Sequence, residues 1–326
     1  MVAQVAGVSA STISRILNGT AVVSELKKQA VEKAIAELGF VPNPMARGLA
    51  GGRTLSVGVV AQVMDSPFYG AALRGIEDEL DPAGYSPLFV SGHWNAANEA
   101  RCIEVLRSRR VDGLIVLTGR LTDQALKNYA KSLPVVVTGR SLKAPSLFAL
   151  DFDNFEGGRL ATQHLLDLGH RRIAFIAGDP NHPDSTERQR GYRATLEAAG
   201  IVPETSLVVP GEYNEVSGQL AVNRLLDSQQ QFTAIFAGND QMATGALLAL
   251  RRRSLRVPED ISLVGFDDLP SSEFFIPPLS TVRHPAYEIG RLAAKSMLQL
   301  LAGTKPEVQM PKPSFVARES TRRLRG

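Results

Sequence analysis

The sequence predicts an α/β protein built on parallel sheets and preceded by a small all-helical domain. From residue 55 onward, short runs of branched apolar residues alternate with stretches of helical length. Strands that are buried in a parallel sheet have this nearly continuous apolar composition. The first forty residues show only helical periodicity, and at 326 residues the chain is long enough for two or three domains.

Residues 2–18 predict two short helices that meet at Gly7. Apolar residues recur at spacings of three and four before this glycine, and Ser9 stands where the second helix needs an N-cap. The second helix places apolar side chains on one face and short polar ones on the other. This pattern is typical of a helix-turn-helix whose second helix lies in the major groove of DNA. The alternative is a helical pair that packs against the rest of the protein.

A third helix is predicted to begin after Ser24 and to end at Gly39, which completes a headpiece over residues 1–42. Residues 43–53 predict a linker with one further short helix. A helix of this length is marginal in water, and Gly48 weakens it by roughly 1 kcal/mol. We therefore expect this segment to form a helix only when contacts outside the segment stabilise it.

Arg15 is the strongest candidate for reading a base, because its guanidinium can donate to O6 and N7 of guanine together. The predicted DNA contacts are Ala10, Ser11, Thr12, Ser14, Arg15, Asn18, Arg47 and Leu49.

Charge is unevenly distributed along the chain. Residues 1–54 carry a net charge of +3, the same as the whole chain, so the remainder is balanced. A positive headpiece joined to a neutral body suits binding to phosphates at one end. The single cysteine, Cys102, cannot form an internal disulfide, which suits a reducing cytoplasm. With neither a secretory signal nor a membrane-spanning run, we expect a cytoplasmic protein without a membrane partner. This disfavours the main rival, an exported solute-binding protein.

The body is predicted to alternate strands and helices, although periodicity alone does not decide between one sheet and two. The predicted strands are 55–61, 87–90, 112–117, 134–137, 172–178, 233–238 and 261–266. The helices that separate them include 71–80, 96–108, 156–168, 190–199, 216–228 and 241–253.

Several motifs carry a resemblance to a known family: AGVSASTISRILNG, ELGFVPNPMARGL, LGHRRIAFIAG, VPEDISLVGFDD and PLSTV. In this order they resemble the LacI/GalR family of bacterial transcriptional regulators over essentially the whole chain. The resemblance implies two Rossmann-like parallel-sheet subdomains of the periplasmic-binding-protein type within residues 54–326. The N-subdomain would comprise 54–151 and 284–307, and the C-subdomain 152–283 and 308–326.

The resemblance further implies a homodimer that binds double-stranded operator DNA, with Leu49 as an apolar wedge in the minor groove. It also implies a small-molecule effector in the cleft, where ligands meet the carboxyl ends of parallel strands. By resemblance, the effector contacts are Asp65, Phe68, Tyr69, Arg188, Tyr213, Asn239 and Asp267. Plain turns, core packing, surface positions and helix caps are the alternatives for these residues, and Trp94 and His93 fit either interpretation.

This set of donors, acceptors and rings predicts a neutral, hydroxyl-rich effector, most simply a sugar. A purine is the alternative, and a phosphorylated ligand is disfavoured because two aspartates balance the one arginine.

No phosphate loop, dinucleotide fingerprint, H-E-x-x-H or G-x-S-x-G motif occurs, so we expect no enzyme, no cofactor and no metal site. The predicted function is an effector-responsive, sequence-specific transcriptional regulator that represses carbohydrate-metabolism genes. The alternatives are a solute-binding protein without a transcriptional role, or a regulator that responds to a purine or another metabolite that is not a sugar.

Overall fold

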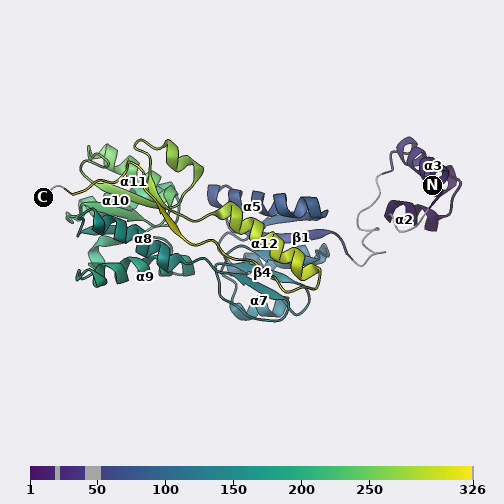
Figure 1. Cartoon of the computed structure of the whole chain (residues 1–326), viewed down its shortest axis with the longest axis horizontal. Coiled ribbons are helices and arrows are strands. Elements are labelled where there is room, and N and C mark those ends of the chain that lie inside the picture. Colours follow the sequence, from purple (N-terminus) through teal and green to yellow (C-terminus); the bar gives the residue numbers. More distant parts are fainter. Residues whose placement is uncertain (19–22, 41–52, 325–326) are drawn as a thin grey trace.

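The computed structural model describes residues 1–18, 23–40 and 53–324 (Figure 1). The predicted short helix within 43–53 and its DNA contacts Arg47 and Leu49 lie outside the described residues.

The headpiece has the three predicted helices, α1 (Val2–Val5), α2 (Ala10–Asn18) and α3 (Glu25–Glu37). Gly7 makes the turn between the first two with a φ of +63°. The hydroxyl of Ser9 accepts the N–H of Thr12 at 3.1 Å, which confirms Ser9 as the cap of α2. Ser24 occupies the N-cap position of α3, but its side chain makes no capping hydrogen bond.

The body contains two sheets, and Figure 1 shows them as two lobes. The first sheet has the order β2-β1-β3-β4-β5 and is parallel throughout. Its strands are β1 (Ser56–Ala61), β2 (Ser86–Ser91), β3 (Gly113–Val116), β4 (Val135–Thr138) and β5 (Leu147–Leu150).

The second sheet has the order β11-β10-β9-β8-β6-β7. Its strands are β6 (Ile173–Ala177), β7 (Val208–Pro210), β8 (Ala234–Ala237), β9 (Ser262–Asp267), β10 (Ser280–Arg283) and β11 (Ser314–Val316). The edge strand β11 pairs antiparallel with β10, and the other neighbouring strands of this sheet pair in parallel.

Helices cover both faces of each sheet. The first sheet carries α5 (Pro67–Leu80), α6 (Ala96–Ser108), α7 (Asp123–Tyr129) and α12 (Ala286–Leu301); the second carries α8 (Asn154–Asp167), α9 (Pro183–Ala198), α10 (Glu215–Asp227) and α11 (Asp240–Arg252). Alternate residues of β1 enter different cores: Val57 and Val59 face α5 and α12, whereas Val60 faces α6. After β10 the chain returns to the first sheet as α12 and then rejoins the second as β11.

Helix α9 begins at Pro183, seven residues before the predicted 190–199. His182 caps this earlier start, because its Nδ1 accepts the N–H of Asp184 at 3.2 Å. Pro183 suits the first helical turn, where no backbone donor is needed. The extra turns place Arg188 within a helix.

Three helix pairs, α5 with α12, α8 with α9 and α10 with α11, pack at glycines. In each pair, a Cβ on a glycine of either helix would overlap the backbone of the other; the glycines are Gly75 with Gly290, Gly158 with Gly191, and Gly218 with Gly245. A Cβ at Gly158 would overlap the carbonyl oxygen of Arg188 itself. The absence of a side chain at Gly158 therefore sets how close Arg188 lies to α8.

Gly158→Ala is expected to lower the free energy of unfolding by about 1–3 kcal/mol, because the added methyl group must push α8 and α9 apart. Gly70→Ala is the control: it lies in α5, where a Cβ would meet no atom within 4 Å. The control should be neutral or stabilise by up to about 1 kcal/mol through helix propensity. Urea unfolding of both variants measures the difference. Equal stability of the two would show that the helices adjust freely at this crossing.

Candidate functional site

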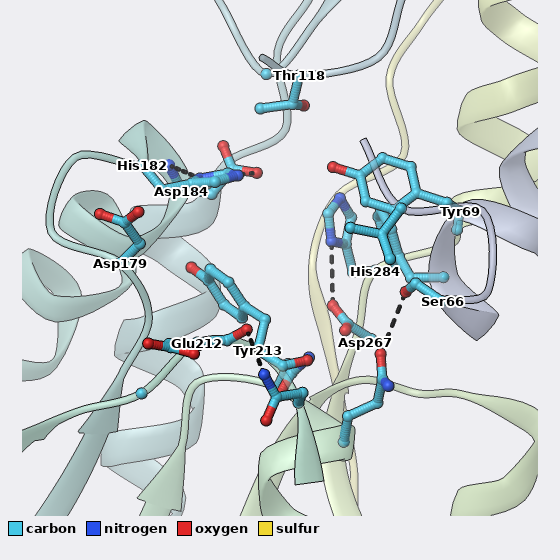
Figure 2. Close-up of a pocket in the computed structure, with 18 of the residues that line it drawn as sticks. Ser66, Tyr69, Thr118, Asp179, His182, Asp184, Glu212, Tyr213, Asp267 and His284 are labelled. Carbon is cyan, nitrogen blue, oxygen red and sulfur yellow. Dashed lines mark hydrogen bonds and ion pairs between the residues drawn. The ribbon is translucent and has the colours of Figure 1, made fainter. Parts of the chain in front are cut away.

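A cavity of about 1100 Å³ lies between the two halves of the body, at the carboxyl ends of strands from both sheets (Figure 2). All seven predicted effector residues line it: Asp65, Phe68, Tyr69, Arg188, Tyr213, Asn239 and Asp267. Trp94 also lines it, whereas His93 is not among the lining residues. The structure thus brings together side chains that lie up to two hundred residues apart in the chain.

Arg188 is buried, so the alternative of a surface position is wrong. Its Nε donates to Asn154 Oδ1 at 2.8 Å, and its Nη1 donates to the carbonyl oxygen of Gly238 at 2.5 Å. The guanidinium lies 3.7 Å from the ring centroid of Phe266, a cation–π contact. Most of its donors are therefore used within the protein, and Nη2 is the part that faces Asp267, at 3.8 Å from Oδ1.

Asp267 ends β9 with a φ of +113°, and its carboxyl is buried. Burial raises the pKa of this carboxyl to about 7; nearby Arg188 opposes the shift and Asp184 adds to it. The neighbouring Asp268 points the other way and pairs with Arg318 at 2.7 Å. The two adjacent acidic side chains therefore have different surroundings.

His284 follows β10 and lies between Arg188 and Asp267. Burial, assisted by the charge of Arg188, lowers the pKa of its imidazole to about 3, so the ring is neutral. Its Nδ1 accepts from Arg188 Nη2 at 3.4 Å and therefore has no proton to offer Asp267 Oδ1, also at 3.4 Å. His284 therefore offers the ionised form of Asp267 no hydrogen bond, which agrees with the raised pKa of its carboxyl.

Asn239 has a role inside the protein as well as a place in the cavity wall. Its Oδ1 caps α11 by accepting the N–H of Met242 at 2.8 Å. Its Nδ2 donates to the carbonyl oxygen of Tyr213 at 3.1 Å. Tyr213 adopts a φ of +59°, and its ring packs on Gly178, where a Cβ would overlap it. Asn239 is thus a helix cap that also holds Tyr213 in place.

Several polar residues that line the cavity were not predicted as parts of the site, among them Asn154, Asp179, His182, Asp184 and His284. Applying the rule on strand ends to β6 would have found Asp179, which follows that strand closely. The same rule did not find His284 because β10 is only four residues long and was not predicted. Asp184 was missed because the start of α9 was placed too late.

Several side-chain contacts among the described residues join the two halves across the cavity. Arg120 forms an ion pair with Asp179. Ser66 Oγ donates to Gln241 Oε1 at 3.2 Å, and the rings of Trp94 and His182 lie 4.5 Å apart. The two halves are therefore held together by side chains that also surround the cavity.

The predicted DNA-contacting face of α2 is open to solvent where it is described. Ala10, Ser11, Ser14 and Arg15 are exposed, and Thr12 is half-buried. Asn18 is the last residue of α2. This arrangement leaves the guanidinium of Arg15 accessible to a nucleic acid.

The described ranges contain neither a metal-binding cluster nor a membrane-spanning helix. No three histidine, cysteine or acidic side chains there are placed to hold a metal ion. No helix in those ranges combines the length and apolar character needed to cross a membrane.

Two family models match the chain: bacterial regulatory proteins of the lacI family at residues 2–43, and a periplasmic binding protein-like domain at residues 162–321. The HTH-type transcriptional repressor PurR of Haemophilus influenzae is 32% identical over 99% of this chain and 98% of its own. A lac repressor dimer bound to operator and the anti-inducer ONPF is 31% identical, with a TM-score of 0.89 over 98% of both chains. A complex of the transcriptional regulator CelR with cellobiose is 35% identical, with a TM-score of 0.74 over 98% of both chains.

Asp267→Asn is expected to gain stability relative to the parent protein as pH rises from about 5 to 8. In the folded protein, Asp267 keeps its proton up to a pKa of about 7, whereas in the unfolded chain it releases the proton near the ordinary pKa of about 3.9. The free energy of unfolding of the parent protein therefore falls as the pH rises between these two values. The asparagine does not titrate. Calorimetric melting of both proteins without ligand across this window measures the difference. A constant difference would mean that Arg188 keeps Asp267 ionised throughout.

Proposed function

This chain belongs to the lacI family of bacterial regulatory proteins and is a DNA-binding transcriptional regulator; from that premise we propose that its central cavity binds an effector that controls operator binding. The observation that carries the proposal is the gathering of all seven predicted effector residues around one cavity. The cavity volume, about 1100 Å³, is ample for a small molecule.

We propose a hydroxyl-rich effector of the sugar class. Asp65 and Asp267 carry oxygens that accept hydrogen bonds from hydroxyl groups, and a protonated Asp267 can also donate one. Phe68, Tyr69 and Trp94 offer flat apolar faces to a sugar ring. The similar CelR structure contains cellobiose, which supports a sugar here as well. A purine could stack on the same rings, but the acidic lining suits hydroxyl donors better.

At the other end of the chain, we propose a homodimer that presents two headpieces to a roughly twofold-symmetric operator and represses carbohydrate-metabolism genes. The headpiece is taken as residues 1–42 and the linker as 43–53, with Arg47 and Leu49 as its DNA contacts. Asn18 completes the proposed contacts of α2. The proposed function needs no catalytic group, and the protein is proposed not to be an enzyme.

Arg15→Ala is expected to flatten the preference for one base pair, at a cost of about 1–3 kcal/mol on the preferred operator. The operator would first be selected from random duplexes with the parent protein. Mobility shifts on operator and random DNA then measure the preference. Lys33→Ala on α3 is the control, because its side chain is exposed and pairs with Glu37 within the helix. Equal losses on both DNAs for Arg15→Ala would make Arg15 a phosphate contact only.

Asp267→Ala is expected to abolish the change in operator affinity that a bound sugar causes, because the carboxyl lies in the cavity wall. A thermal-shift screen of sugars would supply the ligand. Asp268→Ala is the matched control and should keep the response, since Asp268 points away from the cavity toward Arg318. Calorimetry would measure the affinity of the variant for the sugar. If Asp267→Ala bound the sugar as tightly as the parent protein, Asp267 would not belong to the site.

A further inference from the structure

The cavity lining carries more negative than positive charge. Two arginines, Arg188 and Arg224, face five acidic residues, Asp65, Asp179, Asp184, Glu212 and Glu215, in addition to Asp267, whose raised pKa leaves it partly protonated at neutral pH. Arg188 is already committed to groups of the protein, and Arg224 is an exposed residue on α10. Asp179 is neutralised by Arg120 from the opposite half. Asp65, Glu212 and Glu215 are exposed, whereas Asp184 is half-buried.

Asp184 lies in the first turn of α9, and its side chain is 13% exposed. No donor in the described part of the chain makes a hydrogen bond to its carboxylate oxygens. The nearest titratable group, His182 Nδ1, lies 4.0 Å from Oδ2. This nitrogen accepts the N–H of Asp184, and burial lowers the pKa of the imidazole, so His182 brings no positive charge. Asp184 is thus a largely buried carboxylate without a counterion.

Aromatic rings surround this carboxylate. The ring of His182 lies 4.5 Å from that of Trp94 and 5.5 Å from that of Tyr213, and the rings of Trp94 and Tyr69 are 6.1 Å apart. Figure 2 shows the hydroxyl end of Tyr213 directed toward the side where His182 and Asp184 lie, with Tyr69 across the cavity. The Tyr213 hydroxyl is buried, and Ser185 is the hydrogen-bonding side chain beside it. Aromatic faces around an anion are a combination that binds organic cations.

We propose that the Asp184 end of the cavity binds a protonated amino group, so that the effector is an amine-bearing polyol such as an amino sugar. This inference rests on the proposed function, because it assigns the effector a chemical class at the same site. It also revises the expectation of a neutral effector, which was based on Asp65, Asp267 and Arg188 without Asp184.

A hydroxyl group would satisfy this site less well than an ammonium group. A neutral sugar would displace water from Asp184 without cancelling its charge, and a carboxylate desolvated in this way is costly. An ammonium group offers three donors together with a full positive charge, and the rings of Trp94 and Tyr69 stabilise that charge further. A phosphorylated or carboxylated ligand would meet like charge, because no free cation lies beside Asp184 in the described part of the wall.

The test uses the full chain and its only tryptophan, Trp94, whose fluorescence reports directly on this end of the cavity. Glucose, galactose, mannose and cellobiose are each titrated against the analogue in which amino groups replace the 2-hydroxyls, and against the N-acetylated form of that analogue. At least one amine is expected to bind about tenfold more tightly than both of its neutral counterparts at neutral pH.

Asp184→Asn, which keeps the shape of the side chain, is expected to weaken amine binding about tenfold while the neutral counterpart changes little. Glu187→Gln is the control: it removes a negative charge from the same helix, but Glu187 pairs with Arg190 at 2.6 Å and does not line the cavity. This control should retain the amine preference. Melting temperatures verify that both variants fold.

Neutral sugars that bind as tightly as their amines, or an Asp184→Asn variant that keeps the amine preference, would overturn the inference. If neutral sugars then still altered operator affinity, the proposed function would stand without it. If no member of the series changed the fluorescence of Trp94 or the melting temperature of the protein, that result would count against both proposals.

Discussion

The buried guanidinium of Arg188 organises the second half of the body. A buried arginine must have its donors paired, and each partner comes from a different element. Asn154 belongs to α8, Gly238 follows β8, Asp267 ends β9 and His284 follows β10. One side chain therefore ties a helix and three loops into a single cavity wall. The glycine crossing of α8 and α9 is what allows Arg188 to lie close enough to reach all of them.

The sequence predicted the elements whose signal is local. The strands β1 to β4, β6, β8 and β9 and the three headpiece helices follow from periodicity, whereas the short strands β5, β7, β10 and β11 were not predicted. The seven effector residues followed from a resemblance carried by short motifs. Features that depend on distant burial were not predicted. The neutral state of His284 arises from its burial and from the charge of Arg188, which lies 96 residues away in the chain. The cap that starts α9 early, His182 followed by Pro183, is a local signal that was overlooked.

One of the contacts that join the two halves, the ion pair between Arg120 and Asp179, is weak. The Arg120 and Asp179 side chains each remain about one-third exposed, and an ion pair so accessible to water contributes little. The loop that carries Arg120 is better fixed, because buried Glu99 accepts its N–H at 2.9 Å and that of Leu121 at 3.0 Å. A ligand that touches both halves can therefore shift their relative angle with a modest difference in binding free energy, while each wall keeps its shape.

Such a shift would reach the linker through a firmly held junction. The carboxylate of Asp112 accepts the N–H groups of Thr54 and Leu55, both at 2.8 Å, directly before β1. Arg53 Nη2 donates to the carbonyl oxygen of Leu301, the last residue of α12, at 2.6 Å. Residue 53 must therefore move with the first half of the body as one piece. In a homodimer, any rotation of the two first halves would change the separation of the paired linkers, and a helix that is marginal by itself responds steeply to such a change.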